Sequence, residues 1–178
     1  MMADIAELQR EIYEAIRAAK KQLGASLGDD PLFGFALGTD DDVRGVYHIA
    51  ASESWVESNK VDYPEIGFVF TDWEQAGGDE AFSPISNRFR ELAEMEYANS
   101  QDWGAARDQR FELLVRALID CRKDGVFAAT TLLDVGSTDP SEHMERLEMQ
   151  AIERLNAPAM ADRLAEALCL EAYRTGSS

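Results

Sequence analysis

Apolar residues change their spacing twice along this chain, and that change of period is what most constrains its fold. Residues 4–23 place apolar side chains at helical intervals after a capping box, and the pattern stops at Gly24. Residues 32–38 and 43–51 instead alternate, as the two strands of a hairpin do, around the polar turn at residues 39–42. Toward the C-terminus the helical spacing returns, which predicts an α+β fold.

Two more strands and five more helices complete the prediction. Residues 66–71 alternate as a third strand, and residues 126–135 read as a fourth strand after a helix that ends at Gly125. The further helices are expected to begin after Ser52, at Ser83-Pro84, after Ser100, after Asp139 and at Pro158. This order predicts a mainly antiparallel sheet of about four strands, covered by about six helices.

We expect these elements to form a single domain over residues 1–178, with residues 175–178 as a disordered tail. The helices would cover one face of the sheet. The other face would be partly exposed to solvent, because antiparallel sheets tolerate water on one side, and an exposed site would most easily lie there.

Negative charge is concentrated in one part of the sequence. The chain carries a net charge of −17, yet residues 1–21 sum to zero and residues 88–178 to −6. Residues 22–87 hold 13 acids and only Arg44 and Lys60, a net of −11. Like charge at this density opposes a compact state, repels nucleic acid and membrane surfaces, and attracts basic partners.

Acidic residues that surround aromatic ones predict a docking site for a basic protein. Trp55 and Trp73 each lie among acids, and aromatic side chains dominate binding hot spots; packing of one ring face into the core is the alternative for both. Charge would speed the encounter and aromatic contacts would slow dissociation. The partner-binding hypothesis names these residues: Asp40, Asp41, Asp42, Glu53, Trp55, Glu57, Asp72, Trp73 and Glu74.

Several short segments carry a resemblance to a known family. They are the opening amphipathic helix, Phe33-Gly-Phe-Ala-Leu before the acidic turn, Ala50-Ala-Ser-Glu53, Phe68-Val-Phe-Thr-Asp-Trp73, Lys123-Asp-Gly-Val-Phe127 and Glu153-Arg-Leu-Asn156. Over nearly its whole length the chain resembles a bacterial family known as domain of unknown function 4303. The resemblance implies a fold and a length but no activity. Proteins of similar size and style often serve as immunity or accessory factors in bacterial toxin systems, an analogy of architecture.

No catalytic, metal-binding or cofactor motif is recognisable. The acidic turn begins like a calcium loop, but Arg44 and Ala51 occupy ligand positions of that pattern. A nucleophile needs a neighbouring base, and His48 and His143 are the only imidazoles; a pairing of Cys121 with His143 stays open. We therefore predict no catalytic residue, no metal ligand and no cofactor.

A carboxylate-dependent hydrolase is the alternative function, with a cleft at the exposed face of the sheet. Such chemistry needs two acids at a defined separation, and Asp72 and Asp134 are the first acids to inspect. Asp134 lies in an apolar run and needs a hydrogen-bond partner if it is buried. We favour a capping role for Asp134, in a loop or at the helix after Asp139.

Cysteine use and hydropathy predict a cytoplasmic protein. Cys121 and Cys169 match no metal or redox spacing, and we expect both thiols to be buried on helices. No secretory signal and no apolar run of membrane-spanning length is recognisable. The oligomeric state is left undetermined.

Overall fold

The structure, a computed structural model, describes residues 2–60, 66–68, 70–73, 75–76, 79–98 and 102–173. The described residues form six α-helices: α1 (Met2–Leu27), α2 (Glu53–Asn59), α3 (Ser83–Ala98), α4 (Trp103–Lys123), α5 (Glu142–Leu155) and α6 (Pro158–Ala167). They also form the strands β1 (Leu32–Thr39), β2 (Val46–Ser52), β3 (Gln75–Ala76) and β4 (Leu132–Ser137). The α+β class and the six helices are as predicted.

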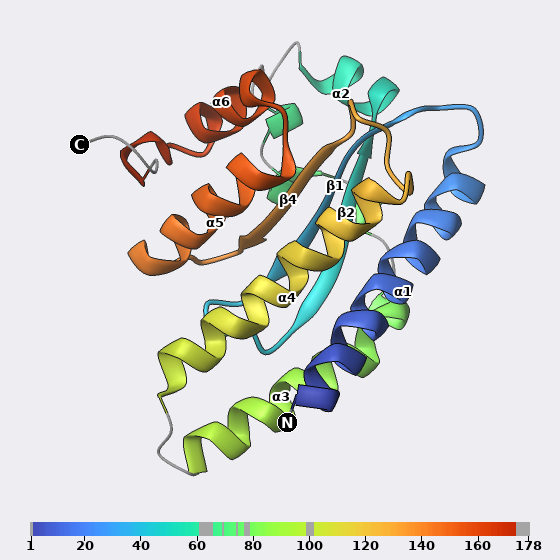
Figure 1. The fold of residues 1–178 in the computed structure, drawn as a ribbon. Helices are drawn as coiled ribbons and strands as arrows, with labels where there is room; N and C mark the ends of the chain where they lie inside the picture. Colours follow the sequence, from blue (N-terminus) through green and yellow to red (C-terminus); the bar gives the residue numbers. More distant parts are fainter. Residues whose placement is uncertain are drawn as a thin grey trace.

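The sheet has the order β3-β2-β1-β4 and is mixed. β1 and β2 pair antiparallel as the expected hairpin, whereas β4 runs parallel to β1, with Gly34 opposite Leu132. Three strands have six or more residues, and β3 adds a pairing of only two. The prediction of a mainly antiparallel sheet is therefore wrong. α4 carries the chain back to the end where β1 begins, so β4 must start there and run in the same direction (Figure 1).

The predicted third strand at residues 66–71 is not formed. Residues Ile66–Phe68 and Phe70–Asp72 form two short 3₁₀ helices instead, and Val69 lies outside the described residues. The Trp73 N–H donates to the Phe70 carbonyl at 3.1 Å. A 3₁₀ turn has three residues, so the rings of Phe70 and Trp73 lie on the same side of this segment, and both are buried. Packing against the sheet therefore decides the conformation of this segment.

Helices cover both faces of the sheet. α1, α3 and α4 lie on one side, and α5 and α6 on the other (Figure 1). β1 alternates between two clusters of buried side chains, with Phe35 and Leu37 in the first and Ala36 in the second. The second cluster also contains residues of α5, α6 and the segment 66–73. The partly exposed sheet face that the sequence led us to expect does not exist among the described residues, because this second layer buries it.

The end of α1 and the burial of one cysteine differ from the prediction. α1 passes through Gly24, where nothing crowds the backbone, and ends at Leu27, followed by Gly28 at φ +60°. A glycine inside a helix costs only about 1 kcal/mol, so it does not end one by itself. Cys121 is fully buried in α4, and burial raises its pKa to about 12. Cys169 is exposed and follows α6, so the prediction that both thiols are buried on helices is wrong for Cys169.

Candidate functional site

The predicted docking residues lie at opposite ends of the hairpin and do not form one surface. Asp40, Asp41 and Asp42 lie in the connection between β1 and β2. Glu53 and Glu57 belong to α2, which begins where β2 ends. The seven residues of β2 separate the two groups by roughly 20 Å.

Asp40 organises the backbone of the hairpin turn. One carboxylate oxygen accepts the N–H groups of Asp42 and Arg44, both at 3.0 Å, and the other accepts that of Gly45 at 3.2 Å. Asp42 forms an ion pair with Arg44 at 2.9 Å. These contacts use carboxylate oxygens that a basic partner would otherwise meet.

Asp41 links the same turn to the N-terminus of α5. Its carboxylate accepts the N–H of Ser141, the N-cap of α5, at 2.8 Å. Burial acts to raise the pKa of Asp41, but the hydrogen bonds from Ser141 and the nearby charges of Arg107 and His143 hold it below its usual value. Asp41 is thus an ionised tertiary contact rather than a free surface charge.

Val43 and Arg110 lock the turn from inside. Val43 has a φ of +52°, unusual for a β-branched residue, and its side chain is fully buried in the first core cluster. The buried guanidinium of Arg110 donates to the carbonyls of Val43 at 3.1 Å and Asp42 at 3.2 Å, and it pairs with Glu96. Sequence reasoning missed Arg110, because an arginine in an amphipathic helix is normally expected to face solvent.

Among the described residues, His143 and Cys121 make their hydrogen bonds to other groups. His143 Nε2 lies 2.9 Å from Asp108 Oδ1, and Asp108 also binds Arg107. The Cys121 thiol lies instead 4.0 Å from the carbonyl of Tyr13. His48 is buried and its ring stacks on Phe35. In the described part of the chain, no three His, Cys, Asp or Glu side chains are grouped as metal ligands.

The other predicted group lies at what we name the α2 acidic end: Asp29, Asp30, Glu53 and Glu57. Asp30 accepts the N–H of Ser54 at 3.2 Å and also binds its hydroxyl, while the Glu53 N–H donates to Pro31. Hydrogen bonds from the Ser52 and Ser54 side chains hold the pKa of Asp30 below its usual value. Trp55 lies half-buried on this helix. Asp29, Glu53 and Glu57 are exposed, so this end presents carboxylates to solvent.

Trp73 belongs to the core and not to a docking surface. Its side chain is only 4% exposed. Its ring lies on Gly34 so closely that a Cβ there would meet the ring at 2.3 Å. Of the two alternatives for this tryptophan, core packing is the one observed. Asp72 ends the second 3₁₀ helix, and Glu74 lies outside the described residues.

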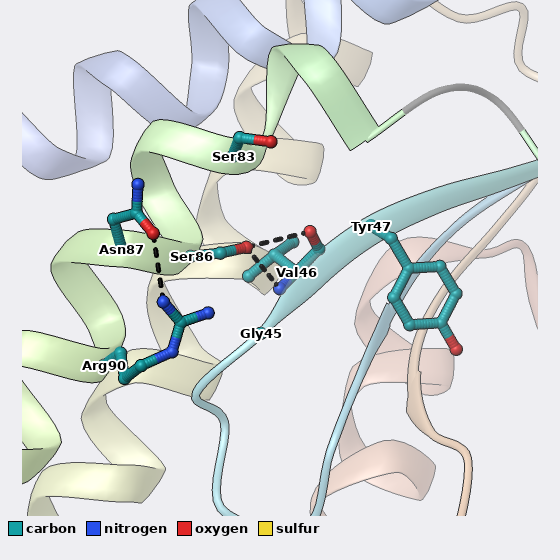
Figure 2. Close-up of a pocket in the computed structure, with 7 residues that line it drawn as sticks. All are labelled: Gly45, Val46, Tyr47, Ser83, Ser86, Asn87 and Arg90. Carbon is teal, nitrogen blue, oxygen red and sulfur yellow. Dashed lines mark hydrogen bonds between the residues drawn. The ribbon is translucent and has the colours of Figure 1, made fainter.

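A pocket of about 280 Å³ opens between β2 and α3. Ser86 Oγ accepts the N–H of Val46 at 2.9 Å and donates to its carbonyl at 3.1 Å, so it takes the place of a neighbouring strand. Arg90 donates to Asn87 at 3.0 Å, and the Tyr47 ring points away from α3 (Figure 2). The polar lining of this pocket therefore covers the edge of β2, which is a structural use.

Two acids face each other in the second core. Asp134 of β4 is fully buried and Glu148 of α5 is 4% exposed. The N–H of Val135 donates to Asp134 Oδ1 at 2.8 Å, and Oδ2 has no hydrogen-bond partner among the described residues. Gly136 makes room for the pair, because a Cβ there would lie 2.4 Å from Glu148 Oε1.

Burial dominates the protonation of this pair. It raises the pKa of Asp134 to about 7, against the opposing hydrogen bond from Val135. Burial, with the charges of Asp134 and Glu145, raises the pKa of Glu148 well above its usual value. The expectation that Asp134 caps a loop or a helix is wrong. Glu148 was missed, although its helical spacing from Met144 and Ile152 places it on the apolar stripe of α5.

These features define the class of protein: an α+β domain with a mixed sheet and a layer of helices on each face. The family model for a domain of unknown function (DUF4303) matches residues 12–157, from within α1 to just beyond α5. The chain belongs to this family. No curated protein and no solved structure matches it. No described helix is both long and apolar enough to span a membrane.

Proposed function

We propose that this protein is a non-enzymatic binding module that captures a basic protein partner at the α2 acidic end. The observation that carries the proposal is the charge there: Asp29, Glu53 and Glu57 are exposed beside Asp30, and the neighbouring base, Lys60, already pairs with Glu57. Carboxylates gathered at one end of a molecule steer a cationic partner toward it and raise the association rate.

The local structure favours a preformed surface. Hydrogen bonds hold Asp30 in place, and Ser52 caps α2 by accepting the Trp55 N–H. A partner therefore meets fixed charges and loses little to ordering them. Half-buried Trp55 offers the aromatic contact that slows dissociation. The turn at Asp40–Asp42 supports docking less well, because its carboxylates bind the backbone and α5.

The finer form of the proposal is an immunity or accessory factor that neutralises a basic toxin, acting in the cytoplasm. It follows from the acidity and from the analogy with small bacterial immunity proteins. A carboxylate-dependent hydrolase is the weaker alternative. Asp134 and Glu148 would be its acids, but both are buried between β4 and α5, and the sheet face that would hold a cleft is covered.

Capture from native cell lysate at low and at high salt, read by mass spectrometry, tests the proposal. We expect a basic protein that is retained at low salt and released at high salt, since screening weakens charge steering. The double variant Glu53→Gln with Glu57→Gln should weaken binding about tenfold. The matched control, Glu91→Gln with Glu94→Gln on exposed positions of α3, should bind like the wild type.

Two results would reject the proposal. Equal binding by both double variants would show that the α2 acidic end is not the docking surface. No salt-sensitive partner of the wild type would remove the binding function itself and leave the acidity as a solubility feature.

A further inference from the structure

Among the residues that the structure describes, no cation balances the buried acids Asp134 and Glu148. Neither side chain forms an ion pair with a lysine, arginine or histidine in the described part of the chain. Asp134 and Gly136 lie two positions apart on one strand face, which puts their Cα atoms about 7 Å apart, and the Glu148 carboxyl occupies the space above Gly136. The two carboxyl groups thus share one small apolar compartment.

The elements around this compartment add further negative charge or none. On α5, Glu145 lies on the side of Glu148, and Arg146 pairs with Glu142 instead. Tyr173 donates its hydroxyl to Glu145. The α5 N-terminal residue His143 is bound to Asp108, away from the pair.

The sheet and the remaining cover bring no charge into contact with the pair among the described residues. β1 presents Gly34, Ala36 and Gly38 on this face, none of which titrates. β2 adds the Tyr47 phenol, which lies over Gly38, and the 3₁₀ segment adds the ring of Phe70 beside Gly136. From α6, Arg163 stacks on Phe68 rather than reaching the pair.

A carboxylate buried without a counter-charge is so costly that the group keeps its proton instead. Two such groups in one compartment disfavour double ionisation still further. We propose that the Asp134–Glu148 pair holds at least one proton at neutral pH and acts as a latch between α5 and β4. When this proton is lost to solvent at alkaline pH, α5 loosens from β4. This inference is independent of the proposed function.

The sign of the effect follows from linkage. Below about pH 3 both acids are protonated in the folded and the unfolded chain, so they add no pH dependence to the stability. As the pH rises, the unfolded chain releases these protons while the folded chain retains them. Each retained proton raises the ratio of unfolded to folded protein by up to tenfold per pH unit. For Asp134 the pH range over which stability falls ends near the pKa of about 7 in the folded chain.

Loosening of α5 also reaches the hairpin. The N-cap Ser141 binds Asp41 of the β1–β2 turn, so movement of α5 removes that contact. Protection of the α5 and β4 amides, relative to their intrinsic exchange rate at each pH, should therefore fall at alkaline pH before the rest of the sheet opens. This local order distinguishes a latch from a general loss of stability.

Carboxyl ¹³C shifts of the whole chain, followed by NMR from about pH 4 to about pH 10, test the pair directly. Assignment by Asp134→Asn and Glu148→Gln should reveal that both groups titrate well above ordinary acids, Asp134 near pH 7. In thermal unfolding, both variants should lose less stability than the wild type between pH 6 and pH 9, whereas the exposed-site control Glu166→Gln should follow the wild type. Titration of both acids near pH 4 in the wild type would overturn the proposal even if neither variant folds.

Discussion

At the scale of single residues, Arg110 shows how one buried side chain supports a turn that lies far from it in sequence. Its guanidinium satisfies the carbonyls of Asp42 and Val43 and balances Glu96. The positive φ of Val43 is strained, and it persists because the Val43 side chain is buried and its carbonyl is held. The hairpin turn is therefore stabilised from α4 as well as by its own residues.

Replacing Arg110 with Met should destabilise the protein strongly. The change leaves Glu96 without its cation and two carbonyls without a donor, so we expect a loss of about 3 kcal/mol in the free energy of unfolding. Urea unfolding measures it. Arg116→Met on the same helix is the control: Arg116 is exposed and pairs with Glu112, so the loss should stay below about 1 kcal/mol. Equal losses would contradict the role given to Arg110.

At the scale of elements, two helices end in the same way with different residues. After α4, Gly125 has φ +74°, and the N–H groups of Gly125 and Val126 donate to Arg122 and Cys121. After α6, Cys169 and Leu170 repeat this pattern with a φ of +59° at Cys169. This Schellman geometry favours glycine, and a cysteine there is strained.

Cys169→Gly should therefore stabilise the chain. We expect a gain of about 0.5–1 kcal/mol, because glycine adopts the left-handed conformation without a Cβ clash. Cys169→Ser keeps the Cβ and should leave stability unchanged, which separates backbone strain from loss of the thiol. Thermal unfolding under reducing conditions measures both. A gain in the serine variant equal to that in the glycine variant would count against the strain.

The element boundaries also show where prediction by local pattern succeeds. Ser52 caps α2 as predicted, and Gly125 ends α4. The N-cap of α5 is Ser141, two residues after the expected Asp139. Regular alternation over residues 32–38 would place Phe33 on the face of Phe35, but an irregularity between Leu32 and Gly34 turns it to the second core. A strand's alternation predicts faces only where its register is regular.

At the scale of the whole molecule, carboxylates act in two opposite ways on stability. The pKa of Asp41 is lowered in the folded state, so the ionised carboxylate stabilises the fold at pH values above the ordinary pKa of an aspartate. This contribution is lost as the pH falls through the lowered pKa. The buried pair in the second core has raised pKa values and acts in the alkaline direction. Stability should therefore be greatest at mildly acidic pH.

Asp41→Asn should flatten the acid side of this profile. The neutral amide cannot gain stability from ionisation, so the variant should lose less stability than the wild type between about pH 5 and about pH 3. At neutral pH the variant should be weaker, because the bond to Ser141 is no longer charge-assisted. Asp139→Asn, an exposed acid near the same helix, is the control and should keep the slope of the wild type.

The sequence by itself determined the helices, the β1–β2 hairpin and the sign of the molecule's charge. Helical stripes, caps and the β1–β2 hairpin depend on residues close together in the chain, so their patterns suffice. Only the tertiary structure decided that β4 runs parallel, that a second layer buries the sheet, and that the predicted acids separate to opposite ends of β2. It also brought Asp134 to Glu148. These outcomes depend on contacts between distant residues, and no local pattern specifies which of 34 acids will meet another within the core.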